Sequence, residues 1–166
     1  MKPTKAITGA EYESPIDTAA FVAIVANVPP YALACYWVLG LTGIRPSQYL
    51  RCRRTDLDPA NFTISVPCDS IGLERVTLAV DPALWTWIDR GVPSPIRYGW
   101  MRTYFKRAAR KIGRPELRLR DLQRFVLGLR SSAAESAAFA ERARQLLPGH
   151  EADLISGDRP TPGAAA

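Results

Sequence analysis

The sequence has no long apolar run of the kind that crosses a membrane. Its longest nearly apolar stretch, residues 31–44, has 14 residues, whereas a membrane-spanning helix needs about 20. Residues 1–15 contain no apolar segment of the signal-peptide kind, which predicts a cytoplasmic protein. These absences exclude a membrane span, and we expect no membrane partner.

Few side chains are available for disulfides or metal sites. Cys35, Cys52 and Cys68 are odd in number, 16 to 17 residues apart and without a C-x-x-C pair, and the only histidine, His150, lies far from them. We therefore predict three reduced, structural thiols in apolar settings. We expect no metal and no cofactor.

The chain of 166 residues is 47% hydrophobic and 23% charged, which suits one domain with its own core. That apolar content excludes disorder of the whole chain. We expect the domain at residues 15–155, between a flexible segment at residues 1–14 and a disordered tail at residues 156–166. The tail is rich in proline, glycine and alanine.

The net charge of +6 is concentrated in one part of the chain. Residues 97–130 hold eleven basic residues and two acidic ones, a local charge of +9, so the remaining residues sum to −3. Such a concentration predicts a polyanionic partner, because each phosphate that a protein neutralises releases condensed counterions. The alternative is a solvated basic helix that aids solubility.

Helix signals dominate, with one short β-rich region. Residues 31–41 are apolar nearly all round, which predicts a helix buried at the centre of the domain. Residues 62–66 and 75–80 are β-rich and separated by a turn, which predicts an antiparallel hairpin. Other helices are expected after Asp17, Pro46 and Pro82, around residues 100–112, from about residue 120 and over about residues 133–147. The predicted fold class is mainly α with a small antiparallel β-sheet (α+β).

Residues 39–58, LGLTGIRPSQYLRCRRTDLD, are the most specific string in the chain. They resemble the first conserved box of the tyrosine recombinase (phage integrase) family: T-G-I-R at 42–45, Leu50 and D-L-D at 56–58 match, and Gln48 stands where glutamate is usual. Residues 119–125, LRDLQRF, resemble the second box. Residues 145–150, QLLPGH, resemble a third box with Pro148 as an insertion. Three boxes in the family's order imply the fold of its catalytic domain.

In that family a tyrosine attacks a DNA phosphodiester and becomes joined to the 3′ phosphate. Arginines stabilise the extra charge of the phosphorane, because a guanidinium engages two phosphate oxygens and stays charged. The resemblance places Arg45 at the first arginine, Arg120 where histidine or lysine is usual and His150 at a late histidine or tryptophan position. It implies Arg45, Arg120 and His150 as the catalytic residues.

Other positions depart from the family pattern. Ser70 lies about where the family has a lysine in the hairpin turn, Gln123 where it has its second arginine and Arg124 where it has the next histidine. The last tyrosine of the sequence is Tyr104, so none follows His150, where the nucleophile is expected. The helices are expected to begin by about residue 15, without the family's separate amino-terminal clamp. We therefore expect a pseudoenzyme that has kept the fold and lost strand cleavage.

Basic residues are expected to contact duplex phosphates whether or not the chain cleaves DNA. They are Arg45, Arg53, Arg54, Arg107, Arg110, Lys111, Arg120 and Arg124. For Arg45 the alternative is a cap on the preceding helix, paired with an acid. Tyr104 and the four tryptophans (Trp37, Trp85, Trp87 and Trp100) are expected to be packing residues.

Three functions are compatible with these patterns. The leading hypothesis is a degenerate recombinase domain that binds double-stranded DNA in recombination or integration, as an accessory to an active recombinase or through self-association. The second is an active site-specific recombinase with an atypical or partner-supplied nucleophile. The third is a protein-interaction module whose basic stripe binds an acidic partner.

Overall fold

The computed structural model describes residues 15–68 and 74–147. The elements, in chain order, are α1 (Thr18–Val25), η2 (Pro30–Ala32), α2 (Leu33–Thr42), α3 (Pro46–Tyr49), η3 (Arg54–Asp56), β1 (Leu57–Asp58), β2 (Thr63–Pro67), β3 (Arg75–Ala79), η4 (Pro82–Leu84), α4 (Trp85–Gly91), α5 (Tyr98–Lys111), α6 (Asp121–Arg130) and α7 (Ala133–Gln145), where η marks a 3₁₀ helix. The predicted mainly helical class with a small antiparallel sheet is confirmed. No helix in the described ranges has both the length and the apolar character needed to span a membrane.

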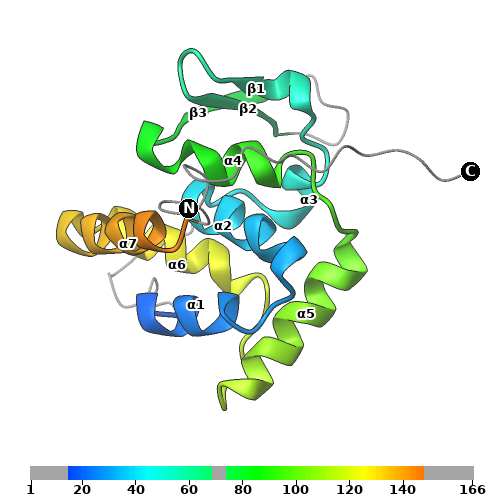
Figure 1. Cartoon of the computed structure of the whole chain (residues 1–166), viewed down its shortest axis with the longest axis vertical. Helices are drawn as coiled ribbons and strands as arrows, with labels where there is room; N and C mark the ends of the chain where they lie inside the picture. The colour runs from blue at the N-terminus through cyan, green and yellow to red at the C-terminus, as the bar shows by residue number, and fades with distance from the viewer. Residues whose placement is uncertain (1–14, 69–73, 148–166) are drawn as a thin grey trace, which may run out of the picture.

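The helices surround α2, and the sheet lies at one end of the molecule (Figure 1). Helix α4 runs between the sheet and α2, while α6 and α7 cover α2 on its other side and α1 and α5 complete the far end. The predicted flexible segment 1–14, the tail 156–166 and His150 lie outside the described residues.

Helix α2 is buried, as its uniformly apolar sequence predicts. The ring of Trp37 stacks on Trp87 of α4 with centroids 5.2 Å apart, and Phe21 of α1 and Phe139 of α7 pack against the same ring. Trp87 also donates from Nε1 to the carbonyl oxygen of Ala143 at 3.1 Å, which ties α4 to α7. The prediction was wrong at Tyr31: this residue lies in the η2 turn that Pro30 begins, before α2, and is 60% exposed.

The sheet contains the predicted hairpin and one strand more. β2 and β3 pair antiparallel, with Ile64 opposite Leu78, and the short β1 adds to the other edge of β2, with Leu57 opposite Ile64. Phe62 is not in the strand as predicted, because its φ of +52° places it in the turn from β1. The Asp58 side chain accepts from the backbone N–H groups of that turn, so it ends the two-residue strand.

Two residues that were expected to be packed or buried, Trp100 and Cys68, lie at the surface instead, and Tyr104 is half-buried against the core. Trp100 is 53% exposed, because Met101 and Phe105 form the buried side of α5 and this flank of the helix stays open. Cys68 is exposed because it follows the last residue of β2, where the strand leaves the core. The other two cysteines are buried and all three are free thiols, as predicted.

Candidate nucleic-acid interface

Arg45 is presented by a tight connection between α2 and α3. Gly43 ends α2 with a φ of +68°, and its N–H donates to the carbonyl oxygen of Leu39 at 2.9 Å. A β-carbon at this glycine would lie 2.8 Å from Cγ1 of Val126 on α6, so the position needs both the glycine's conformation and its lack of a side chain. Arg45 follows two residues later as the residue that caps α3, and its side chain is exposed.

Gln48 fixes the backbone at Arg45. Its Oε1 accepts from the N–H of Arg45 at 2.9 Å, while its Nε2 donates to the carbonyl oxygen of Pro67 at 3.3 Å. One amide group thus joins the start of α3 to the end of β2. A glutamate, which is usual at this position in the family that the box resembles, has the acceptor and lacks the donor.

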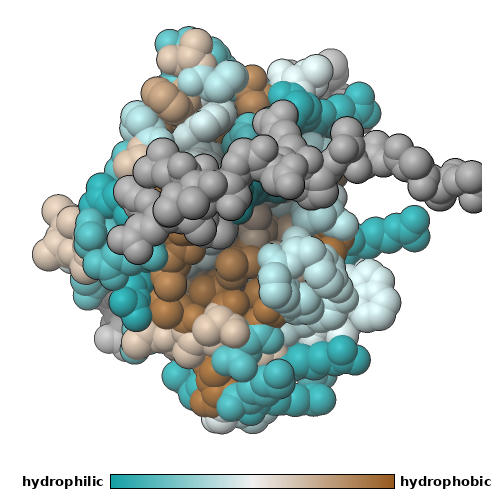
Figure 2. Space-filling view, in the orientation of Figure 1, coloured by the Kyte–Doolittle hydropathy of each residue, from teal (hydrophilic) through white to brown (hydrophobic). Residues whose placement is uncertain are grey.

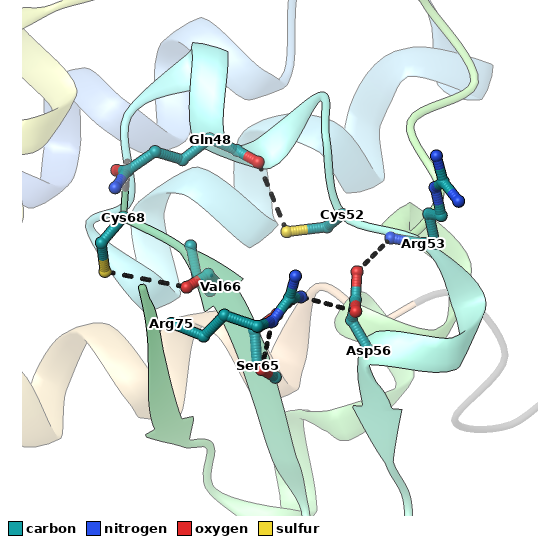
Figure 3. A network of polar contacts seen from close by, with 8 residues as sticks. All are labelled: Gln48, Cys52, Arg53, Asp56, Ser65, Val66, Cys68 and Arg75. Carbon is teal, nitrogen blue, oxygen red and sulfur yellow. Dashed lines mark hydrogen bonds and ion pairs between the residues drawn. The ribbon is translucent and has the colours of Figure 1, made fainter. Parts of the chain in front are cut away.

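The acidic residues of the first box have structural partners. Asp56 accepts from the backbone N–H of Arg53 at 2.7 Å and pairs with Arg75 at 2.5 Å (Figure 3). Arg75 also donates to the side chain and the carbonyl oxygen of Ser65, at 2.8 and 2.9 Å. This network joins η3 to the sheet through the backbone of Arg53, whose guanidinium points away from Asp56.

Arg54 is held by the protein itself. Its guanidinium pairs with the Asp89 carboxylate at 2.6 Å and donates to the carbonyl oxygens of Asp89 and Val92, at 2.6 and 3.3 Å. These contacts attach η3 to the end of α4. A structural role therefore accounts for Arg54, and its predicted contact with DNA stays a prediction.

Helix α6 presents Arg120 and Arg124 on its outer side. The buried Asp121 carboxylate accepts from the N–H of Arg118 at 2.8 Å, which stabilises the turn into the helix. Leu122, Phe125, Val126 and Leu129 face the core, so Arg120 and Arg124, one turn apart, share the exposed side.

The segments that carry Arg45 and Arg124 are in direct contact. Gly43 touches Val126, and Arg130 donates to the carbonyl oxygen of Thr42 at 2.9 Å. Arg45 lies two residues beyond Gly43, and Arg124 two residues before Val126. The structure therefore brings the first and second boxes onto neighbouring segments, whereas His150 and Ser70 lie outside the described residues.

Helix α5 carries the densest positive charge. Its inner side is formed by Met101, Phe105, Ala108 and Ala109. The basic residues of the helix are all exposed: Arg102, Lys106, Arg107, Arg110 and Lys111. From residue 97 to residue 114 the chain has seven basic residues and no acidic one.

Several acidic side chains of the described region pair with arginines that, apart from Arg54, lie outside the predicted set of DNA contacts. The ion pairs join Asp56 to Arg75, Asp89 to Arg54, Glu116 to Arg114, and both Asp81 and Glu141 to Arg144. Seven of the eight predicted DNA contacts make no ion pair with any described residue: Arg45, Arg53, Arg107, Arg110, Lys111, Arg120 and Arg124. Exposed cations without acidic neighbours repel one another, and an anionic ligand would relieve that repulsion.

The tyrosines of the described ranges divide into a buried and a surface group. Tyr36 donates to the carbonyl oxygen of Met101 at 2.6 Å and Tyr49 to that of Gly91, and burial raises the pKa of both phenols above 10.0. Buried, hydrogen-bonded phenols of raised pKa are poor nucleophiles. At the surface, the hydroxyl groups of Tyr31 and Tyr104 are hydrogen-bonded to each other, and that bond raises the pKa of Tyr31.

The sequence alone did not predict the hydrogen bond from Gln48 to the carbonyl oxygen of Pro67, nor the exposed aromatic group around Trp100. The available signal for the latter was the width of the apolar stripe from Trp100 to Ile112, which is too broad for one buried side of a helix.

No family profile matches the chain, and no curated protein matches it. Among solved structures, a lambda integrase fragment, crystallised as a dimer bound to a COC′ core site, superposes on it with a TM-score of 0.53 at 15% sequence identity. The fold is similar to that of lambda integrase. The match covers 96% of this chain and 66% of the integrase chain, so the chain spans just under two thirds of the length of that integrase fragment. The likeness extends over nearly all of this chain, and at this identity it shows the fold alone.

Proposed function

We propose that this chain is a DNA-binding domain with a recombinase-like fold, which contacts duplex phosphates through an exposed basic surface and does not itself cleave strands. We assign the domain to residues 15–155. The observation that carries the proposal is the set of seven exposed cations that make no ion pair with any described residue, on a fold similar to that of an integrase bound to its core site. The proposed context is DNA recombination or integration.

Arg45 is the proposed central phosphate contact. Its backbone is fixed by Gln48 and by the close packing of Gly43 on Val126, so the exposed guanidinium extends from a rigid segment of backbone. Arg124 comes from the segment that Gly43 touches, and Arg120 lies one turn earlier on the same side of α6. Planar guanidinium groups suit phosphate oxygens, because each can donate two parallel hydrogen bonds.

The burial of two of the described tyrosines supports the proposal that strand cleavage is lost. Tyr36 and Tyr49 lie in the core with their hydroxyl groups bonded to backbone carbonyls. Arg120 and Gln123 replace the residues that the second box usually supplies, and an arginine at 120 keeps its charge and so cannot exchange a proton. The remaining arginines stabilise negative charge without attacking phosphorus.

Fluorescence anisotropy with a labelled duplex, over a salt series from about 50 to 200 mM, tests the binding. We expect weak non-specific affinity, near 10⁻⁴–10⁻⁶ M at physiological salt, with a steep negative salt slope. The Arg107→Ala/Lys111→Ala variant should reduce the magnitude of that slope by about 2. The charge-matched Arg142→Ala/Arg144→Ala variant removes two cations from α7 and should change it little.

Absence of binding by the wild type at low salt would refute the DNA proposal and favour the protein-interaction alternative. Equal effects of the two charge-matched variants would show that net charge alone drives association.

A suicide DNA substrate tests cleavage separately. We expect no covalent adduct from this chain. An adduct that survives denaturing electrophoresis and maps to a tyrosine would establish the alternative of an active recombinase. An adduct that forms only when an active recombinase is added, and that joins DNA to the added chain, would fit the accessory role.

A further inference from the structure

The outer side of α5 carries a regular row of aromatic and basic residues. Trp100 and Tyr104 are one turn apart, and Arg107 and Lys111 continue the row at the same 3–4 spacing, with Arg97 at its other end. The row runs over 14 residue steps, about 21 Å at 1.5 Å per residue. Figure 2 shows hydrophilic and near-neutral residues over the part of the surface where α5 lies.

Two hollows lie along this row. The first, of about 450 Å³, is lined by Tyr31, Pro95, Ile96, Arg97, Trp100 and Tyr104. The second, of about 370 Å³, lies between residues 26–29 and the side chains of Tyr104, Arg107 and Lys111. Tyr104 lines both hollows, so the two adjoin at this residue, and together they make up the groove between α5 and the segment that leads into α2.

The aromatic rings at the first hollow are ordered relative to one another. Trp100 stacks on Tyr104, with centroids 5.5 Å apart and ring planes at 24°, and Tyr31 meets Tyr104 edge to face at 6.1 Å and 81°. A hydrogen bond between the hydroxyl groups of Tyr31 and Tyr104 holds the second pair. Trp100 and Tyr31 are nevertheless 53% and 60% exposed, so packing accounts for only part of their surface.

We propose that this groove binds unpaired nucleotides of single-stranded DNA, with a base stacked on the exposed ring of Trp100 and the flanking phosphates at Arg97, Arg107 and Lys111. The inference rests on the proposed DNA-binding function and adds a second kind of DNA site to it. Aromatic rings along a positively charged groove are the combination that single-strand binding uses, because every base has a face that stacks and every nucleotide a phosphate.

Charge favours a nucleic acid over a peptide in this groove. An aromatic groove of this kind also suits a proline-rich peptide. Cations lie at both ends of the row, and no acidic residue occurs from residue 97 to residue 114. A nucleic acid can stack its bases on the rings and pair its phosphates with the cations, whereas an uncharged proline-rich segment can contact the rings alone. At 3.4 Å per nucleotide, the row accommodates about six stacked nucleotides.

Tryptophan fluorescence and anisotropy with a single-stranded thymidine oligonucleotide of about ten nucleotides test the proposal. We expect the oligonucleotide to quench the fluorescence of the full chain. Trp100→Ala should lower single-strand affinity about 5- to 150-fold and change duplex affinity less than about twofold. Trp100→Phe, which keeps an aromatic face, should restore most of the affinity. Leu127→Ala, which truncates an exposed apolar residue on α6, is the control.

The outcomes separate this inference from the proposed function. Duplex binding without quenching by the single strand, or equal losses in Trp100→Ala and Leu127→Ala, would overturn the inference and leave the duplex proposal standing. Quenching by a proline-rich peptide and not by the oligonucleotide would assign the groove to a protein partner. Failure to bind either form of DNA at low salt would refute both.

Discussion

Replacing Gln48 by alanine should weaken both the fold and the presentation of Arg45. The substitution removes the acceptor for the N–H of Arg45, at 2.9 Å, and the donor to the Pro67 carbonyl, at 3.3 Å. A hydrogen bond contributes about 0.5–1.5 kcal/mol net, and water partly replaces both partners at this half-buried site. We expect Gln48→Ala to lower the free energy of unfolding by about 1–2 kcal/mol, measured by urea denaturation.

The conservative variant Gln48→Glu separates the two hydrogen bonds. It keeps the acceptor for Arg45 but places a carboxylate oxygen against the carbonyl of Pro67. A negative charge in the first turn of a helix contributes about 0.3–1 kcal/mol of stabilisation and offsets part of that loss. The expected decrease in the free energy of unfolding is therefore smaller than for alanine. Because salt screens the interaction of the carboxylate with the helix N-terminus, this decrease should be smaller still at low salt.

A double-mutant cycle connects Gln48 to DNA binding. One charge-assisted phosphate contact contributes about 1.5–3 kcal/mol at most, which bounds the effect of Arg45→Ala on duplex affinity. If Gln48 acts by positioning Arg45, then Gln48→Ala should weaken duplex binding in the wild type and have almost no further effect in Arg45→Ala. Additive losses in the double variant, or an unchanged free energy of unfolding in Gln48→Ala, would refute the reasoning.

Three further measurements follow from the packing and titration of the core. Gly91→Ala would place a methyl group 2.5 Å from Cγ2 of Val38, so it should lower the free energy of unfolding by about 1–3 kcal/mol in urea denaturation, and unchanged stability would contradict this. Timed alkylation at neutral pH, followed by intact mass, should modify Cys68 first and the two buried cysteines only on unfolding, and one common rate for all three would contradict the described burial. Burial raises the pKa of Cys52 from 9.0 to about 11 and that of Tyr49 above 10.0, so the native chain retains protons that the unfolded chain releases. Stability in urea should therefore fall as the pH rises above about 9, and a flat profile up to pH 11 would be inconsistent with this.

Local sequence was sufficient for the elements whose signals are local. The apolar run before Gly43 predicts a buried helix, and the glycine adopts the left-handed conformation that ends it. The β-rich runs on either side of residues 69–74 predict the hairpin, and the pairing of Ile64 with Leu78 is consistent with it. The three boxes that resemble the recombinase family are also short and local, and their order carried the fold prediction although the chain is only 15% identical to the integrase.

Features set by tertiary contacts were not predictable. β1 has two residues and exists because Leu57 meets Ile64 across the sheet. Arg54 resembles the neighbouring arginines in sequence, yet Asp89, 35 residues later, pairs with it. The exposure of Trp100 depends on which side of α5 packs against α1, and helical spacing alone leaves that side undetermined.

The bond between Thr42 and Arg130 spans 88 residues of chain, and this separation sets an order on folding during synthesis. At a translation rate of about 5–20 residues per second, the end of α2 is synthesised about 4–18 s before Arg130 of α6, which binds it. Phe21 of α1, which also packs on Trp37, is synthesised before α2, whereas Trp87 follows Trp37 by 50 residues and Phe139 of α7 follows later still. Until α6 and α7 are synthesised, a nascent chain therefore exposes part of the apolar surface of α2. We expect chaperones to bind this surface during that interval.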